Sequence, residues 1–280
     1  MAAAKRSRTA QGVTAERVIL ADMGVIDDPF SEVLLAASWK PFVRMVQHWP
    51  TSTPPWSVAR AGLAARVLWH DAQLAASLDA GIRQVAVIGA GYDTRAWRFR
   101  REDVAFFELD HSATQSDKRR RAPSPGPTYV EADLNSKDAA QALARCGLDP
   151  SQPTHFIVEG VTMYLSEDVV SDQLAGLADA SGVGSRLSAD FYPPTDVGTS
   201  QDRRLMRAQR LARAGSGEKL RLHVDRSVAE ELLSASGWDV EVLTSLRDAA
   251  FQFVPDHFGL PLPAINEHKT LAAAKRSRRP

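Results

Sequence analysis

Five short apolar runs in the middle of the chain each close on a glycine or a carboxylate. These closing residues follow one another at intervals of 21, 23, 26 and 31 residues, and they are Gly89, Asp110, Asp133, Glu159 and Asp190. Each interval fits one strand plus one helix, which returns the chain to the same edge of a parallel sheet. Open sheets of this kind bind ligands outside the carboxyl ends of their strands. The spacing therefore predicts an α/β fold in which four carboxylates and a glycine turn share one rim.

The pattern around these runs predicts the remaining elements. Strands are expected at residues 85–88, 106–110, 129–133, 156–160 and 187–191, and a later strand with alternating faces at 238–246. From Thr14 to about Ala80 the pattern is helical, apart from a segment rich in proline and tryptophan at 49–56. A further helix at 227–236 is expected to be capped by Ser227, with Glu230 completing a capping box.

Composition excludes several classes of protein. The 34 lysines and arginines equal the 34 aspartates and glutamates, so the formal net charge is zero. A neutral protein has no overall electrostatic attraction to nucleic acid, so nucleic acid is not expected as a partner. The single cysteine, Cys146, cannot form an internal disulfide or a cysteine-based metal site, which suits a reducing cytoplasm. We expect no signal peptide, because the basic residues at 5–8 are not followed by an apolar segment. The sequence has no run of about 18 apolar residues, the length needed to span a bilayer, so no membrane partner is expected.

The glycine turn and the carboxylate that follows it indicate a cofactor. Gly89 and Gly91 let the backbone approach a bound molecule closely. Asp110 lies about 20 residues further on, where an acid accepts hydrogen bonds from both hydroxyls of a ribose. A dinucleotide site has a third glycine where this chain has Thr94, and Asp93 would repel a pyrophosphate at the start of the next helix. A carboxylate there suits S-adenosylmethionine, an adenosine-containing cofactor with an ammonium and a sulfonium group.

One domain is expected over residues 1–280. Its expected parts are a flexible tail (1–13), a helical prelude (14–80), a cofactor-binding core (81–194), a cap insertion (195–226), the end of the core (227–262) and a second flexible tail (263–280). The heptamer AAAKRSR occurs in both tails, at 2–8 and 272–278. Alanines and basic residues at the ends of a chain predict solvated, frayed segments.

Four motifs in a fixed order resemble one known family. They are VAVIGAGYDTRAWRF at 85–99, FELD at 107–110, EADL at 131–134 and EGVTMYL at 159–165. The chain is similar to the leucine carboxyl methyltransferase family of class I S-adenosylmethionine-dependent methyltransferases. It most resembles the bacterial branch of small-molecule O-methyltransferases, some of which act in polyketide pathways. The resemblance implies a doubly wound, mostly parallel, seven-stranded Rossmann-like sheet with a helical N-terminal prelude and a helical cap insertion.

The resemblance also implies roles for individual residues. Arg66 would pair with the carboxylate of the methionine part of the cofactor, and Asp110 would hold its ribose. Arg95 and Arg98 are expected to brace the rim. The cofactor-binding positions implied in this way are Arg66, Gly89, Ala90, Gly91, Asp93, Asp110, Asp133, Leu134 and Glu159. The expected catalytic residues are Glu159, near the methionine part, and Tyr164, which lies with Met163 close to the transfer channel.

The acceptor of the methyl group is less constrained. A carboxylate is already ionised at neutral pH, whereas a phenol with a pKa near 10 benefits from a general base. No histidine stands in a recognisable base motif, which favours a carboxylate over a phenolic hydroxyl. His223, Arg207 and Arg210 are expected to bind the substrate, an anionic or carrier-protein-bound small molecule, although the arginines also fit a solvated helix face.

Three other functions share parts of this pattern. A nicotinamide-dependent oxidoreductase has the same strand, glycine turn and acid, but Asp93, Thr94 and the lack of a Tyr-x-x-x-Lys pair count against it. A nucleic-acid N-methyltransferase has an (Asn/Asp/Ser)-Pro-Pro-aromatic loop where this chain has residues 159–162. A domain that binds S-adenosylmethionine without catalysis stays open, because cofactor-binding residues alone do not prove turnover.

Overall fold

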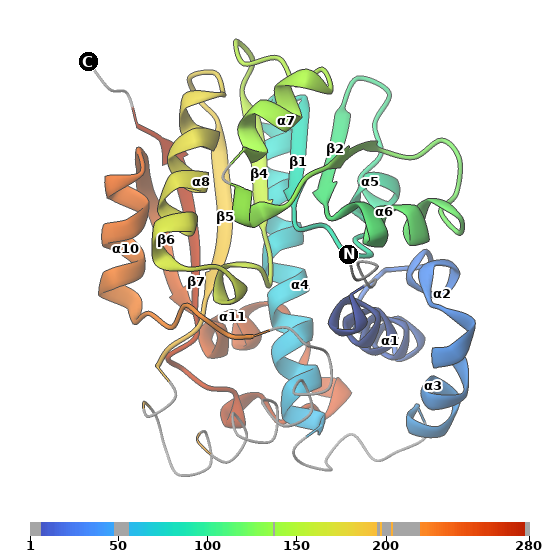
Figure 1. Ribbon diagram of the computed structural model, residues 1–280. Coiled ribbons are helices and arrows are strands. Elements are labelled where there is room, and N and C mark those ends of the chain that lie inside the picture. The colour runs from blue at the N-terminus through green and yellow to red at the C-terminus, as the bar shows by residue number, and fades with distance from the viewer. Residues whose placement is uncertain are drawn as a thin grey trace.

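A seven-stranded sheet forms the centre of the protein (Figure 1). The computed structural model describes residues 7–47, 56–136, 138–194, 197, 203 and 219–277. Five strands are parallel: β1 (Gln84–Ile88), β2 (Ala105–Asp110), β3 (Thr128–Glu131), β4 (Thr154–Val158) and β5 (Arg186–Phe191). Two antiparallel strands, β6 (Trp238–Ser245) and β7 (Thr270–Arg276), complete the order β3-β2-β1-β4-β5-β7-β6. The predicted doubly wound, mostly parallel α/β sheet of seven strands is confirmed.

Helices cover both faces of this sheet. One face carries α7 (Ala139–Arg145), α8 (Glu167–Asp179) and α10 (Arg226–Ala235). The other carries α4 (Trp56–Asp79), α5 (Arg95–Arg98) and α11 (Leu246–Phe253). In β1, Ala86 and Ile88 pack against the first set of helices, whereas Val85 and Val87 pack against the second. Burial from both sides explains why the first strand is an uninterrupted apolar run.

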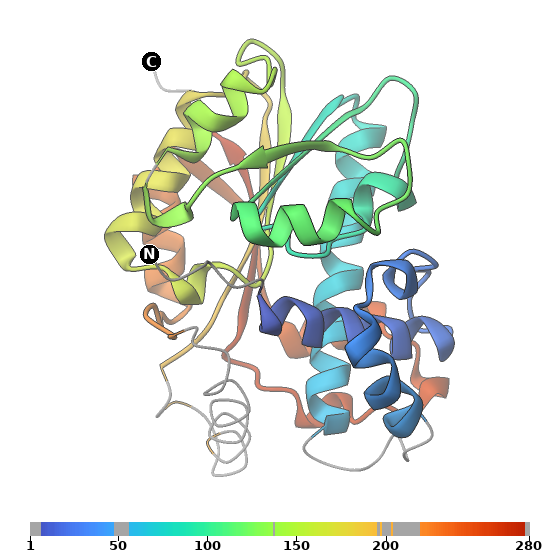
Figure 2. The same ribbon diagram turned by 45° about the vertical axis from the view of Figure 1, so that its right-hand side comes forward.

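A layer of helical segments lies beyond the carboxyl ends of the parallel strands. It consists of α1 (Arg8–Asp22), α2 (Ser31–Leu34), η1 (Ala37–Trp39) and α3 (Lys40–Val46). Figure 2 shows this layer beside the N-terminal half of α4, which continues past the sheet. A Cβ atom on Gly91, just after β1, would lie 3.2 Å from the Cβ atom of Ala10 in α1, so the layer closes directly over the glycine turn. The expected cap insertion at 195–226 lies mostly outside the described residues.

The prediction of flexible tails is wrong for the residues that the structure describes at both ends. The C-terminal tail was expected at 263–280, but residues 270–276 form β7, which lies inside the sheet between β5 and β6. Alanines 272 to 274 are buried there, and pairing on both sides determines their conformation although alanine has a low strand propensity. At the other end α1 begins at Arg8, within the tail expected at 1–13, and the Ser7 hydroxyl accepts a hydrogen bond from the Ala10 N–H.

The start of α10 also differs from the prediction. Asp225, not Ser227, is the N-cap residue, because its side chain accepts a hydrogen bond from the Val228 N–H at 3.0 Å. Ser227 lies inside the first turn, where its hydroxyl donates to the same Asp225 carboxylate at 2.8 Å. A carboxylate at the N-cap also interacts favourably with the helix dipole. In the part of the chain that the structure describes, no helix has the length and apolar character needed to cross a membrane.

Candidate active site

A cavity of about 980 Å³ lies at the carboxyl ends of β1, β2 and β4. Its walls come from these strand ends, from α1 and α4, and from the segment that precedes β7. Ligand pockets measure about 300 to 1,000 Å³, so this volume suits a cofactor together with a second small molecule. Every residue predicted to bind the cofactor lines the cavity, namely Arg66, Gly89, Ala90, Gly91, Asp93, Asp110, Asp133, Leu134 and Glu159.

Asp110 is fixed at the end of β2 by two backbone hydrogen bonds. Its Oδ2 accepts from the Gly91 N–H and its Oδ1 from the His111 N–H, each at 2.6 Å. Each carboxylate oxygen has a further lone pair, so both can accept hydrogen bonds from ribose hydroxyls. Burial raises the pKa of the Asp110 carboxyl group, while the N–H groups of Gly91 and His111 act in the opposite direction. This geometry suits the ribose-binding role that the sequence predicts.

Asp133 and Leu134 lie beyond the end of β3. The Oδ1 of Asp133 accepts hydrogen bonds from the backbone N–H and the side-chain amide of Asn135, both at 2.9 Å. These hydrogen bonds lower the pKa of the Asp133 carboxyl group, so it stays ionised at neutral pH. Leu134 begins the short helix η2 (Leu134–Ser136) and adds an apolar surface to the cavity. An ionised acceptor beside an apolar surface suits the amino group and ring of an adenine.

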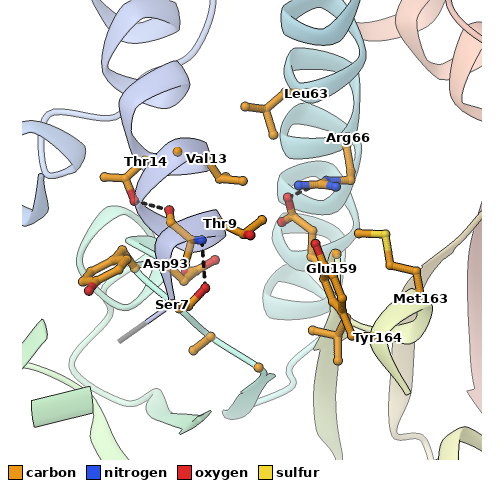
Figure 3. Close-up of a pocket in the computed structure, with 18 of the residues that line it drawn as sticks. Ser7, Thr9, Val13, Thr14, Leu63, Arg66, Asp93, Glu159, Met163 and Tyr164 are labelled. Carbon is orange, nitrogen blue, oxygen red and sulfur yellow. Dashed lines mark hydrogen bonds and ion pairs between the residues drawn. The ribbon is translucent and has the colours of Figure 1, made fainter. Parts of the chain in front are cut away.

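Arg66, on α4, connects the ends of β4 and β5. Its Nε donates to Glu159 Oε1 at 3.0 Å, and its Nη1 donates to the Tyr192 hydroxyl at 2.9 Å. Asp190 Oδ2 lies 3.5 Å from the same Nη1. Figure 3 shows the Arg66–Glu159 pair at the cavity, between α4 and the residues that follow β4. Burial alone would lower the pKa of Arg66, but Tyr192, Glu159 and Asp190 together raise it, so Arg66 is a permanent cation.

Arg95 holds three carboxylates together beneath the cavity. Its Nε lies 2.7 Å from Asp71 Oδ1, its Nη1 lies 2.5 Å from Asp93 Oδ2, and its Nη2 lies 2.8 Å from Glu159 Oε2. Arg98 binds the other oxygen of Asp71 at 2.6 Å. Both arginines therefore brace the rim, as predicted. Burial alone would raise the pKa of Asp93, but Arg95 and other nearby cations lower it below its usual value. Asp93 therefore stays ionised on the cavity wall.

The residues on the wall fit S-adenosylmethionine. Thr9, in the first turn of α1, lines the cavity (Figure 3), and its buried hydroxyl has no hydrogen-bond partner among the described residues. Such a hydroxyl is costly to bury, so a polar group of a ligand is expected to satisfy it. Arg66 suits the carboxylate of the methionine part, Asp110 suits the ribose, and Glu159 adds negative charge near the ammonium group. These individual assignments remain predictions.

The residues predicted to act on the substrate have different locations. Tyr164 and Met163 line the cavity from η3 (Thr162–Tyr164), as Figure 3 shows. His223 is not on the cavity wall; its Nδ1 lies 3.2 Å from the Pro193 carbonyl oxygen, so its ring contacts the loop after β5 instead. The last two residues predicted to bind the substrate, Arg207 and Arg210, lie outside the described residues.

Two buried cations near the site were missed by the sequence analysis. Arg17, on α1, pairs with Asp28 at 2.7 Å, and its Nη1 lies 3.9 Å from Asp93. Lys118, on α6 (Ser112–Arg119), pairs with Glu108 and donates to the Asp93 carbonyl oxygen at 2.6 Å. A signal for Lys118 was present, because an acid inside an apolar strand, as Glu108 is in β2, requires a cation or a proton.

The strand order and the cavity wall define a class of protein. A parallel sheet in the order β3-β2-β1-β4-β5, followed by an antiparallel β7 and β6, is combined with a glycine turn after β1 and a carboxylate at the end of β2. This arrangement defines the class I S-adenosylmethionine-dependent methyltransferases. The family model of the leucine carboxyl methyltransferases matches residues 10–178, which is more than half of the chain. The chain belongs to the leucine carboxyl methyltransferase family.

Related proteins agree with this assignment. A protein of Mycolicibacterium paratuberculosis, named as an S-adenosyl-L-methionine-dependent methyltransferase, is 31% identical over 275 residues, which cover 90% of this chain and 86% of the relative. A protein of Mycobacterium avium with the same name is 32% identical over 252 residues and covers 82% and 80%. The crystal structure of a protein from Thermobifida fusca, described as a methyltransferase, has a TM-score of 0.60 at 17% identity and covers 97% and 96%. The Thermobifida fusca structure shows the fold, while the family match and the two mycobacterial relatives favour a methyltransferase over a nicotinamide-dependent oxidoreductase.

Asp110→Asn is expected to weaken the binding of S-adenosylhomocysteine roughly 10- to 150-fold, because the variant loses a charged hydrogen-bond acceptor worth about 1.5–3 kcal/mol. Isothermal titration calorimetry measures the dissociation constant of S-adenosylhomocysteine for the wild type and for the variant. The matched control is Asp138→Asn, since Asp138 is 44% exposed and does not line the cavity. Wild-type affinity in Asp110→Asn would remove the ribose-binding role from this residue.

Proposed function

We propose that the protein transfers the methyl group of S-adenosylmethionine to a carboxylate oxygen of a small molecule. The observation that carries this proposal is the pairing of Glu159 with two arginines, since its Oε1 lies 3.0 Å from Arg66 Nε and its Oε2 lies 2.8 Å from Arg95 Nη2. Burial raises the pKa of its carboxyl group, but Arg95 and Arg66 outweigh burial and hold the pKa well below its usual range. A carboxylate with so low a pKa is a poor proton acceptor at neutral pH. Glu159 is therefore not expected to act as a general base. A methyl acceptor that is already ionised needs no such base, so this site suits it.

The histidines support the same choice. Among the described residues that line the cavity, the one histidine is His111, which lies beside Asp110 at the ribose end. Its Nδ1 accepts a hydrogen bond from the Ala113 N–H at 3.2 Å and so caps α6. A phenolic acceptor with a pKa near 10 would need a base near the transferred methyl group. A carboxylate acceptor needs none, so the described wall suits a carboxylate better than a phenol.

Catalysis then depends on alignment and on the exclusion of water. S-adenosylmethionine supplies a methyl group that its sulfonium has already activated. A carboxylate oxygen forms a bond to the methyl carbon while the carbon–sulfur bond breaks, the electron pair of that bond remains on sulfur, and no proton moves. Positioning of this kind is worth about 7–11 kcal/mol in favourable intramolecular reactions.

The residues of this chain would share the work of positioning. We assign the ribose to Asp110 and the carboxylate of the methionine part to Arg66. Glu159 orients Arg66 through the 3.0 Å contact of Arg66 Nε with Glu159 Oε1, and this is a positioning role that involves no proton transfer. Tyr164 and Met163 would flank the path between the two reacting groups, because both line the cavity after β4.

Methyl-labelled S-adenosylmethionine tests the proposal. The full chain is incubated with a panel of aromatic and aliphatic carboxylic acids and with phenols of matching size, and mass spectrometry detects the label before and after mild base. Methyl esters hydrolyse in mild base, whereas aryl methyl ethers survive it. We expect label in base-labile products. Label found only in base-stable products would contradict carboxyl methylation, and failure to bind S-adenosylhomocysteine would contradict methyltransferase function altogether.

A further inference from the structure

The glycine turn after β1 is tied to its neighbours at Gly91 and again at Asp93. The Gly91 N–H donates to Asp110 Oδ2 at 2.6 Å, at the end of β2. The backbone carbonyl oxygen of Asp93 accepts a hydrogen bond from Lys118 Nζ at 2.6 Å. Lys118 belongs to α6, which follows directly after β2 (Figure 1). Gly91 and Asp93 both line the cavity, so these two ties set the position of the wall that faces the cofactor.

Lys118 carries its charge in a buried, largely apolar setting. Its side chain is 1% exposed, and its Nζ lies 5.3 Å from the centre of the Trp97 ring. Its carboxylate partner is Glu108 in β2, whose side chain is also 1% exposed. A buried ammonium group is costly without a compensating charge. Ionised Glu108 therefore keeps Lys118 charged and in contact with the glycine turn.

Glu108 itself is poised to lose its charge. Its Oε2 contacts Lys118, whereas its Oε1 is buried and has no hydrogen-bond partner among the described residues. The groups that face it are Lys118 from α6, Asp93 from the glycine turn, Asp110 from β2 and Tyr129, its partner in β3. Burial and the two aspartates raise the pKa of Glu108 to about 7, although Lys118 acts to lower it. Glu108 therefore takes up a proton as the pH falls from 8 to 6.

We propose that Lys118 and Glu108 are positioning residues for the cofactor: ionised Glu108 holds Lys118, and Lys118 holds the glycine turn through the carbonyl oxygen of Asp93. The inference concerns the binding of S-adenosylmethionine and does not depend on which molecule accepts the methyl group. Neither side chain lines the cavity, so both act through the turn. When Glu108 takes up a proton, Lys118 loses its compensating charge and the turn is held less firmly. The affinity for the cofactor therefore falls as the pH falls.

The charge of the cofactor acts in the same direction. S-adenosylmethionine and S-adenosylhomocysteine both carry an ammonium group, which is predicted to lie near Asp93. A cation bound there offsets the negative charge of Asp93, one of the two carboxylates that raise the pKa of Glu108. Binding thus lowers the pKa of Glu108. By linkage, a ligand that favours ionised Glu108 binds more tightly above pH 7 than below it.

The pH dependence of S-adenosylhomocysteine binding tests the proposal. Calorimetry measures the dissociation constant for the full chain at pH 8 and pH 6, in the wild type and in Glu108→Gln. If tight binding requires the ionised form of a group with a pKa of about 7, affinity falls about tenfold between these pH values. We expect Glu108→Gln to bind roughly tenfold more weakly than the wild type at pH 8 and equally at pH 6. His111 also lines the cavity, but both proteins retain it, so its contribution cancels.

Two further variants complete the experiment. Glu108→Gln/Lys118→Met replaces the buried ion pair with neutral side chains of similar size, and it provides a second measurement if Glu108→Gln does not fold. It is expected to bind as weakly as Glu108→Gln at pH 8 and to lack the extra pH response of the wild type. The matched control is Glu131→Gln, since Glu131 lies on β3, has a side chain that is 47% exposed and does not line the cavity. The control is expected to follow the wild type at both pH values.

The outcomes separate a positioning role from a purely structural one. A loss of affinity at pH 8 that disappears at pH 6 supports the proposal, because the wild type then carries a protonated Glu108. An affinity that is lower by the same factor at both pH values indicates general damage to the site and overturns the proposal. Wild-type affinity of Glu108→Gln at pH 8, or a double variant with the same pH response as the wild type, also overturns it. Equal affinities of the wild type at pH 8 and pH 6 overturn it as well.

Discussion

Replacing Arg95 with methionine is expected to destabilise the folded protein by about 3–5 kcal/mol, the range for breaking a buried ion pair from one side. The Arg95 side chain is fully buried and contacts Asp71, Asp93 and Glu159. Methionine has a similar length but no charge, so these carboxylates would lose the cation that they share. Urea unfolding followed by circular dichroism measures the difference in unfolding free energy between wild type and variant.

Arg101→Met is the matched control for this prediction. Arg101 pairs with Asp79 at 2.8 Å, but the two side chains are 41% and 70% exposed. Exposed pairs contribute about 0–1 kcal/mol, so the control is expected to unfold at nearly the wild-type urea concentration. Similar losses in the two variants would contradict the conclusion that a buried, shared cation stabilises the rim. If Arg95→Met is insoluble while Arg101→Met stays soluble, that result agrees with the same conclusion.

Between pH 7 and pH 5, the wild type is expected to lose about 4 kcal/mol more stability than the double variant His70→Gln/His155→Gln. Burial lowers the pKa of each histidine to about 3 in the folded protein. In the unfolded chain a histidine has a pKa of about 6.5. The unfolded state therefore takes up protons between these values while the folded state does not, so stability falls as the pH falls through 6.5. Urea unfolding at several pH values measures this slope.

The structure explains why both rings stay neutral. His155 Nδ1 lies 2.7 Å from the Ser77 hydroxyl, and its Nε2 lies 3.2 Å from the Ser188 hydroxyl. The His70 Nδ1 lies 3.0 Å from the same Ser188 hydroxyl. Hydroxyl groups can donate or accept, so these contacts suit neutral rings without compensating a positive charge. His70 Nε2 is buried and has no hydrogen-bond partner among the described residues, so nothing there stabilises a proton on it. The control is His257→Gln/His268→Gln, since these histidines are exposed; a slope that changes as much in this control would contradict the prediction.

The fold could be predicted largely from the middle of the chain. β1 and β4 are buried on both faces, so each is an apolar run that ends at the rim after a regular interval. β7 gave no such signal. Its alanines have no strand preference, and only the pairing with β5 and β6 determines their conformation. A local sequence pattern cannot reveal a strand whose conformation depends on pairing with residues that are distant in the sequence.

The candidate site could be predicted at the strand ends but not in the helices. Asp110 and Glu159 were identifiable because parallel topology brings strand ends to one rim. Asp71 and Lys118 were not, since helix packing sets which of their neighbours they contact. Glu108 in β2 indicates that a cation or a proton lies nearby, but not which residue supplies it. Lys118 begins the basic run Lys118 to Arg121, which has the pattern of a solvated helix end. Its side chain is 1% exposed and pairs with Glu108, a contact that requires the tertiary structure.

The internal position of β7 has a consequence for the order of folding. β6 joins the parallel strands only through β7, and β7 lies 79 residues beyond the end of β5, at Thr270 after Phe191. Until β7 arrives, β5 has an unpaired backbone edge, and such edges pair readily with other chains. During refolding, pairing of β5 with other chains is therefore expected to compete with its pairing with β7, so a lower protein concentration favours the folded monomer.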